Sequence, residues 1–190
     1  YSTDYVFDGE KGSPYYENDK PNPLQIYGIS KLAGEYAALS LYPEKTFIIR
    51  SCGIFGGHKG SKSKGGNFVL NIIKESKNKK NVEVSSEQIV NPTYAGHLSK
   101  ATLKLLDSKS PAGIYHLASE GCCSWYEFAK KIFQLFKIKK VIKPVDRGGL
   151  SGKMRRPKFS ALQNTKAKSL GIKLPSWQEG LKSYMNFLNS

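Results

Sequence analysis

Residues 27–51 read YGISKLAGEYAALSLYPEKTFIIRS, a helical pattern that leads directly into a strand pattern. Apolar residues recur at the spacing of one helix face, which predicts a helix from Tyr27 to about Leu41. The β-branched run at residues 46–51 predicts a short buried strand. A helix that leads into a buried strand is the repeating unit of proteins with an α/β fold.

The same alternation continues on both sides of this stretch. Asn67 is a suitable cap for a second helix, and Ser124 and Ser176 each precede a glutamate at the spacing of a capping box. The sequence therefore predicts the α/β fold class. Further strands are expected at residues 1–7, 82–84, 113–118 and 141–145, and further helices at residues 68–76, 93–106, 125–136 and 177–188.

Length and composition limit the class of protein. The chain has 190 residues, 39% of them hydrophobic, which is enough for one domain with a sizeable core. It holds no run of about 20 apolar residues, so we expect no membrane span. The cysteines, Cys52, Cys122 and Cys123, show no Cys-x-x-Cys spacing and favour a reducing compartment such as the cytoplasm. The histidines lie far apart in the sequence, and we expect no metal site.

The chain is strongly basic. Its 30 lysines and arginines against 15 acidic residues give a formal net charge of +15. This excess fits either an anionic partner or a lysine-rich surface that is simply solvated. The densest runs, at residues 77–80 and 137–140, lack the interleaved arginine and aromatic residues that stack on nucleic-acid bases. Nucleic acid is therefore not expected as the main partner.

Tyr27 and Lys31 carry the most specific chemistry. Four residues apart on a helix, they share one face. An ammonium group next to a phenol favours the phenolate form, which suits a tyrosine to proton exchange. Thr3 lies at a predicted strand end, and ligands of open α/β sheets bind at the carboxyl ends of the parallel strands.

Several blocks between residues 2 and 181 carry a resemblance to one known family. They include STDYVFDG at residues 2–9, PYYENDKPNPLQIYGISKLAGE at 14–35, NPTYAGHL at 91–98, GIYHLASEG at 113–121, RRPKFSAL at 155–162 and LPSWQEGL at 174–181. They are similar to the dTDP-4-dehydrorhamnose reductases, which are extended short-chain dehydrogenase/reductases. The resemblance implies the last part of a Rossmann-type, doubly wound parallel sheet plus a smaller mixed α/β substrate-binding region.

The resemblance also divides the chain in two. Residues 1–52 would be the carboxy-terminal part of an NAD(P)-binding Rossmann domain and would carry Thr3, Tyr27 and Lys31. Residues 53–190 would be mainly a substrate-binding region, with some segments returning to the Rossmann sheet.

The implied reaction is reduction of the C4 keto group of a nucleotide-linked 4-keto-6-deoxy sugar by NADPH or NADH, as in the conversion of dTDP-4-dehydrorhamnose to dTDP-rhamnose. Tyr27 would protonate the keto oxygen and Lys31 would support Tyr27 and bind the nicotinamide ribose. Thr3 would hydrogen-bond either the keto oxygen or the phenol. The cofactor site would also include Ser2 and Cys52, and the substrate site would include Asp4, Tyr5, Val6, Asn67 and Arg156.

The sequence departs from the family in two places. The glycine-rich turn that binds the cofactor pyrophosphate does not occur in it. We therefore expect a carboxy-terminal fragment that is inactive alone. Its expected partners are a nucleotide-diphosphate sugar, the missing amino-terminal Rossmann half and a second copy in a homodimer. Gly53 stands where bacterial rhamnose enzymes usually have a tryptophan, which leaves the sugar open.

Three alternatives remain open. Sugar-nucleotide epimerases and dehydratases use the same Tyr27 and Lys31 pair, but usually with a further acid or base near the strand end. A regulatory subunit of methionine adenosyltransferase resembles the same family and acts by interaction, although the intact Thr3, Tyr27 and Lys31 favour catalysis. The net charge alone would also suit a nucleic-acid-binding module.

Overall fold

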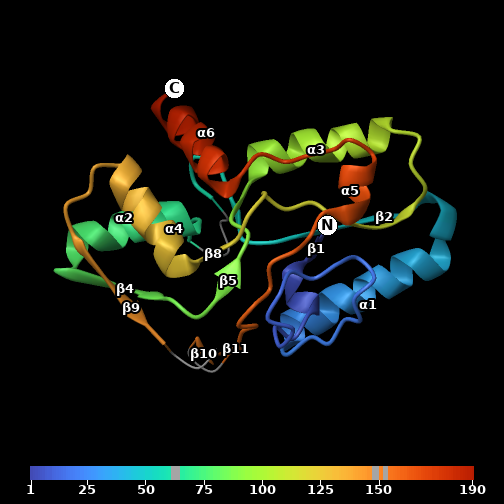
Figure 1. Cartoon of the computed structure of the whole chain (residues 1–190), viewed down its shortest axis with the longest axis horizontal. Coiled ribbons are helices and arrows are strands. Elements are labelled where there is room, and N and C mark those ends of the chain that lie inside the picture. The colour runs from blue at the N-terminus through green and yellow to red at the C-terminus, as the bar shows by residue number, and fades with distance from the viewer. Residues whose placement is uncertain (61–64, 147–149, 152–153) are drawn as a thin grey trace.

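The computed structural model describes residues 1–60, 65–146, 150–151 and 154–190 (Figure 1). Strands and helices alternate along it, which confirms the predicted α/β class. The helices are α1 (Ile26–Leu41), α2 (Phe68–Asn78), α3 (Ala95–Asp107), α4 (Trp125–Leu135), α5 (Thr165–Ser169) and α6 (Trp177–Asn189). The strands are β1 (Ser2–Thr3), β2 (Phe47–Ser51), β3 (Ile54–Phe55), β4 (Asn81–Ser85), β5 (Ile89–Val90), β6 (Thr93–Tyr94), β7 (Gly113–His116), β8 (Cys123–Ser124), β9 (Val141–Val145), β10 (Leu150–Ser151) and β11 (Met154–Arg155).

Three parallel strands form the sheet that carries the site. β2 lies in the middle, with Thr3 of β1 aligned with its Ser51 and His116 of β7 aligned with its Arg50. Parallel neighbours need a crossover connection, and α1 supplies it between β1 and β2. β7 comes much later in the chain and returns to the same sheet.

The two faces of this sheet are covered by different helices. Successive residues of a strand point to opposite faces. Ile49 of β2 belongs to an apolar layer with Leu98 and Leu105 of α3 and Ala167 of α5. The next residue, Arg50, bonds a side chain of α1 on the other face. Figure 1 shows the same three layers, α1 on one side and α3 with α5 on the other. This arrangement is typical of doubly wound α/β proteins.

The other elements form a lobe around a second parallel pair. β4 and β9 pair over all five residues of each strand, and α2 and α4 pack on them. The core of this lobe is aromatic: Phe55, Phe128, Trp177 and Tyr184 are each at most 7% exposed. The two-residue strands form three further pairs, β3 with β6, β5 with β8 and β10 with β11.

The pairing of β4 with β9 also brings the two densest lysine runs together. Asn81 is aligned with Val141 in a parallel register. Lys80 and Lys140 immediately precede these two residues, and both are exposed. Because the strands pair in parallel register, the two lysines lie near each other at one end of the lobe.

The first strand is shorter than predicted. It was expected over residues 1–7 but ends after Thr3, where the chain turns into the short 3-10 helix η1 (Asp4–Val6). The cause is local, because the Thr3 hydroxyl accepts a hydrogen bond from the Tyr5 N–H and so competes with the strand.

The predicted helix starts are confirmed to within two residues, and α1 begins at Ile26, one residue before the predicted Tyr27. Asn67 caps α2, and capping boxes begin α4 at Ser124 and α6 at Ser176. α3 begins at Ala95 rather than at residue 93, because the two residues before it pair with β3 as β6.

Within the described ranges, no helix combines the length and the apolar character needed to cross a membrane. The division of the chain at residue 52 stays a prediction, although β7 places a segment of the second part in the sheet of the first.

Candidate active site

The carboxyl end of β1 and the start of α1 lie next to each other. Thr3, the last residue of β1, accepts a hydrogen bond of 3.2 Å from the Tyr5 N–H. The Tyr5 ring meets the Tyr27 ring edge to face, with the ring centroids 6.2 Å apart. Tyr27 is 47% exposed. Two of the predicted catalytic residues are therefore brought together through Tyr5, and the Tyr27 ring stays accessible.

Gly28 allows this close approach. A Cβ atom at position 28 would lie 2.2 Å from the carbonyl oxygen of Tyr5 and 2.9 Å from Cβ of Pro23. A larger residue would push the helix away from the strand end. The spacing between α1 and η1 is therefore limited by backbone contact.

A buried ion pair fixes α1 to the sheet. The Glu35 carboxylate accepts hydrogen bonds from Nη2 of Arg50 at 2.6 Å and from its Nε at 3.0 Å, and both side chains are 2% exposed. The Ser2 hydroxyl donates to the same carboxylate. Tyr27, Lys31 and Glu35 follow one another at four-residue intervals along one stripe of α1. The ion pair therefore sets the rotation of the helix, and with it the direction of Lys31.

The Asp4 carboxylate joins three segments that are far apart in the sequence. It accepts hydrogen bonds from Oγ1 of Thr3 at 3.0 Å, from Sγ of Cys52 at 3.1 Å and from Oγ of Ser160 at 2.6 Å. All four residues are at most 6% exposed. Burial raises the pKa of Asp4 above its ordinary value, and the three donors offset only part of that rise.

The groups around Asp4 keep their protons. Burial raises the pKa of the Cys52 thiol well above its ordinary value, and the Asp4 charge adds to the effect. Burial and then Asp4 also raise the pKa of Tyr5, while Arg156 acts in the opposite direction. At neutral pH, Cys52 is therefore a thiol and Tyr5 a phenol, and neither is suited to act as a nucleophile or base.

A cavity of about 540 Å³ adjoins the segment that follows η1. Its volume is typical of a small-molecule site. Arg156 lines this cavity, and its charge acts against the rise in the pKa of Tyr5 in η1, so the cavity lies near the strand end. Nε of Arg156 is buried and has no hydrogen-bond partner among the described residues. The cavity is lined by Asp8, Gly9, Glu10, Gly12, Leu24, Glu87, Ile89, Arg155, Arg156, Lys158 and Phe159.

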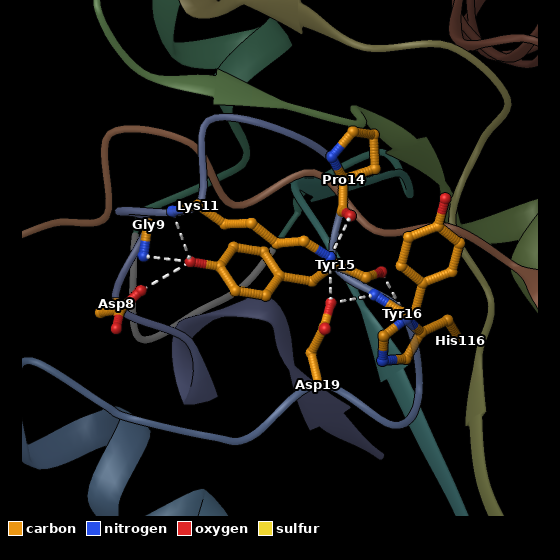
Figure 2. A network of polar contacts seen from close by, with 8 residues as sticks. All are labelled: Asp8, Gly9, Lys11, Pro14, Tyr15, Tyr16, Asp19 and His116. Carbon is orange, nitrogen blue, oxygen red and sulfur yellow. Dashed lines mark hydrogen bonds and ion pairs between the residues drawn. The ribbon is translucent and has the colours of Figure 1, made fainter.

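Tyr15 holds one wall of this cavity in place (Figure 2). Its hydroxyl donates to Asp8 at 2.6 Å and accepts from the backbone N–H groups of Gly9 and Lys11. Its carbonyl oxygen lies 3.1 Å from Nδ1 of His116, a contact in which the ring nitrogen donates. The turn-rich segment after η1 is therefore fixed both internally and to β7.

Asn67 lies elsewhere, in the lobe. Its side-chain amide donates to the Gly56 carbonyl at 3.0 Å and to the Tyr184 hydroxyl at 2.9 Å, while its oxygen caps α2. It is not among the described residues that line the cavity. Contact of Asn67 with a substrate stays a prediction.

Other predicted site residues have internal partners. The side chains of Ser2, Asp4 and Cys52 belong to the networks described above, and Val6 is 0% exposed in an apolar cluster. Their contact with a cofactor or substrate stays a prediction.

The sequence analysis did not identify several residues that shape this region. Glu35, Arg50 and Ser160 act through partners distant in sequence, and Arg155 and Lys158 line the cavity. The adjacent pair Arg155 and Arg156 was the one signal in the sequence that could have indicated this cavity. Among the described residues, no cluster of His, Cys, Asp or Glu side chains is suited to a metal ion.

The comparisons with known proteins agree with the resemblance in the sequence. All of residues 1–190 match the family described as the RmlD substrate binding domain. The spore coat polysaccharide biosynthesis protein SpsK of Bacillus subtilis is 38% identical over 184 residues, which cover 97% of this chain and 62% of that protein. The dTDP-4-dehydrorhamnose reductase of Escherichia coli K12 is 33% identical over 201 residues, which cover 99% of this chain and 64% of that protein. The chain thus spans less than two thirds of the length of these relatives.

Solved structures show the same fold. A crystal structure of dTDP-4-dehydrorhamnose reductase from Bacillus anthracis in complex with NADP matches with a TM-score of 0.88 and 37% identity, covering 100% of this chain and 64% of that one. UDP-glucose 4-epimerase from Thermotoga maritima matches with a TM-score of 0.79 at 21% identity over 99% of this chain and 62% of that one, a likeness of fold alone.

Proposed function

Because the chain belongs to the RmlD substrate binding domain family, we propose that the protein reduces the C4 keto group of a nucleotide-linked 4-keto-6-deoxy sugar, from dTDP-4-dehydrorhamnose to dTDP-rhamnose. The observation that carries this proposal is the placement of the accessible Tyr27 beside the end of β1, next to Tyr5 and Thr3. Relatives of 33% and 36% identity that are named dTDP-4-dehydrorhamnose reductase support it.

Tyr27 is the general acid in this proposal. Its phenol donates a proton to the keto oxygen while the C4 carbon gains a hydride, so that the carbonyl becomes a hydroxyl and the phenol a phenolate. Lys31 shares the helix stripe of Tyr27 and stabilises that phenolate. Thr3 ends β1, and its hydroxyl accepts a hydrogen bond from the Tyr5 N–H. In this proposal Thr3 helps to orient the sugar at the strand end.

The residues of α1 fit a reduced nicotinamide cofactor, NADPH or NADH. Tyr27 and Lys31 offer a phenol and an ammonium group that can bond ribose hydroxyls. When bound, the cofactor supplies the hydride. The NADP complex of a protein 37% identical favours NADPH. Ser2 and Cys52 would contribute backbone groups to this site, because their side chains bond partners inside the protein.

The cavity is the proposed substrate site. Its volume of about 540 Å³ suits a nucleotide sugar, and Arg155, Arg156 and Lys158 would attract the diphosphate. The buried Nε of Arg156 supports this role, because an anion would provide the acceptor that no described residue provides. Tyr5 would contact the sugar. The other predicted substrate residues, Asp4, Val6 and Asn67, do not line the cavity, and their contact with the substrate stays a prediction.

The proposal extends to the whole protein. Residues 1–52 would complete a Rossmann domain together with an amino-terminal half, and residues 53–190 would form mainly the substrate-binding region. The coverage of only 62% to 64% of the relatives supports this arrangement. We further propose a homodimer that works in the cytoplasm, where the three free cysteines would remain reduced.

Turnover by the full-length gene product tests the reaction. Oxidation of NADPH and of NADH would be followed on dTDP-4-dehydrorhamnose for the wild type, for Tyr27→Phe and for Tyr36→Phe, a control on the same helix that is 60% exposed. We expect Tyr27→Phe to lower kcat by about 100-fold or more while cofactor binding persists. Full activity of Tyr27→Phe would disprove the role of Tyr27. A wild type that binds cofactor but does not turn over would disprove the substrate assignment.

A further inference from the structure

We propose that Arg50 is a positioning residue that keeps Lys31 free to support Tyr27. It does so by occupying the Glu35 carboxylate, which would otherwise pair with the Lys31 ammonium group. The catalytic consequence rests on the proposed reductase function, whereas the competition for Lys31 does not.

Lys31 lies between two possible partners on one stripe of α1. Tyr27 precedes it by four residues, and Glu35 follows it by four. Opposite charges at this spacing attract each other on a helix. Nonetheless, no hydrogen bond or ion pair connects the Lys31 ammonium group with Glu35 or with any other described residue. Another group therefore occupies the carboxylate.

Both oxygens of the Glu35 carboxylate are bound from the side of the sheet. Oε2 accepts from Nη2 of Arg50 at 2.6 Å, and Oε1 accepts from Nε of Arg50 at 3.0 Å. The Ser2 hydroxyl also donates to Oε1. A planar guanidinium group that bonds both oxygens of a carboxylate holds it in one direction. Glu35 is therefore held toward β1 and β2.

Arg50 is itself fixed in place. Its backbone belongs to the central strand β2, and its guanidinium carbon lies 5.2 Å from the centroid of the Phe7 ring. Its Nη1 is buried without a hydrogen-bond partner among the described residues, so Glu35 provides the charge that offsets Arg50. His116 adds no charge at neutral pH, because burial and then the Arg50 charge lower its pKa to about 3. The charges of Glu35 and Arg50 thus offset each other.

Loss of Arg50 would change the balance of charge along the stripe. Glu35 would keep its carboxylate, with the Ser2 hydroxyl as the remaining donor. Lys31 is the only basic residue in the sequence of α1, so it is the cation best placed to move toward that carboxylate. An ammonium group drawn toward Glu35 no longer stabilises the Tyr27 phenolate.

The other groups near Tyr27 would stay as they are. From η1, the Tyr5 ring meets the Tyr27 ring edge to face, and the Arg156 charge acts on Tyr5. Arg50 belongs to neither contact. A change in the titration of Tyr27 on loss of Arg50 would therefore report on Lys31 and Glu35.

Tyrosine ring-carbon NMR of the full-length protein tests the competition without requiring turnover. The Tyr27 signal would be assigned with Tyr27→Phe and titrated in the wild type and in Arg50→Met. We expect Arg50→Met to move this titration upward by about 1 pH unit, because the phenolate loses its ammonium neighbour. Arg50→Met combined with Glu35→Gln should restore the wild-type titration, since an amide carries no charge to attract Lys31. Lys45→Met is the matched control, because it removes one exposed positive charge just beyond the end of α1.

The same titration in a Lys31→Met background separates the two ways in which Glu35 could act. Arg50→Met should cause no further shift there, because its effect passes through Lys31. A shift as large as in the wild-type background would overturn the proposal, since the carboxylate would then act on Tyr27 directly. An unchanged Tyr27 titration in Arg50→Met would also overturn it.

Arg50→Lys serves if Arg50→Met does not fold. A single ammonium group keeps the charge but does not reproduce the planar fork that bonds both carboxylate oxygens. We expect a smaller upward shift of the Tyr27 titration that disappears in the Lys31→Met background. No shift in Arg50→Lys would overturn the proposal in that case.

Kinetics of the full-length protein test the consequence for the reaction. Arg50→Met should lower kcat by about tenfold with KM for the sugar unchanged, because the support of Tyr27 acts at the proton transfer. The variant that combines Arg50→Met with Glu35→Gln should recover most of kcat. A kcat as low in the combined variant as in Arg50→Met would overturn the positioning role. Absence of turnover in the wild type would instead count against the reductase function, and the Tyr27 titration would then decide the role of Arg50.

Discussion

The sheet region and the lobe have interiors of different chemistry. Around the three-stranded sheet, Asp4, Glu35 and Arg50 are buried at 4% exposure or less and hydrogen-bond to specific partners. In the lobe, the interior holds aromatic rings, such as Phe55 and Phe128 with centroids 5.3 Å apart. Buried charges contribute little net stability but demand defined geometry, whereas apolar burial stabilises without strong direction. The polar interior lies where side chains need fixed orientations, next to Tyr27 and Thr3.

The largest effect should come from breaking the buried ion pair. Glu35→Ala leaves Arg50 charged and buried without its partner, and we expect a loss of about 3–5 kcal/mol in the free energy of unfolding. The double variant Glu35→Met, Arg50→Met should recover much of that loss, because apolar residues of similar volume often replace an ion pair without cost. Urea unfolding followed by circular dichroism measures both.

The lobe supplies the contrast for this measurement. Phe128→Ala should lower the free energy of unfolding by a similar amount, about 3–5 kcal/mol, because it leaves a cavity in the apolar core. Phe128→Leu would fill part of that cavity and should cost less. A Glu35→Met, Arg50→Met variant as unstable as Glu35→Ala would show that the ion pair adds net stability. The difference between the two regions would then not hold.

An intermediate effect should come from acid. Burial lowers the pKa of His116 to about 3, whereas the imidazole of the unfolded chain titrates near 6.5. The folded state therefore resists a proton that the unfolded state accepts. The stability tied to His116 is complete above about pH 6.5 and is lost as the pH falls toward 3, by about a few kcal/mol in total.

Replacing His116 with Gln should flatten the pH dependence of the unfolding free energy between these two values. His58→Asn is the matched control, because His58 is exposed. If His116→Gln kept the wild-type slope, the acid sensitivity would have another source.

The smallest of the three effects should come from a helix cap in the lobe. The Ser176 hydroxyl accepts from the Glu179 N–H at 3.3 Å and so satisfies one free N–H at the start of α6. Ser176→Ala should cost about 1 kcal/mol, while Ser176→Asp should keep most of the stability. Equal losses in both variants, measured by urea unfolding, would contradict a capping role.

What the sequence could predict was local. The capping boxes at Ser124 and Ser176 and the helix stripe through Tyr27 and Lys31 depend on residues within one or two turns. The end of the first strand at Thr3 was missed, because a hydroxyl that bonds a backbone N–H two residues later can end a strand whose residues favour β structure.

What the sequence could not predict depends on contacts between distant segments. Asp4 bonds Ser160 across 156 residues, and nothing in the spacing of either residue indicates that pair. Glu35 looked like an ordinary helix residue until Arg50 was placed opposite it. The amide of Asn67 joins the Gly56 turn to Tyr184, a contact across 117 residues that its position before a helix did not indicate, and its contact with a substrate stays a prediction.

Gly28 has a consequence for how such a site can change in evolution. With a Cβ position 2.2 Å from the Tyr5 carbonyl oxygen, α1 already stands as near to the strand end as the backbone permits. A lineage that adapts to a smaller sugar cannot bring Tyr27 closer by moving this helix. Under the proposed function, a new substrate preference would therefore arise from the residues that line the cavity, such as Arg155, Lys158 and Phe159, while the position of α1 stays constant.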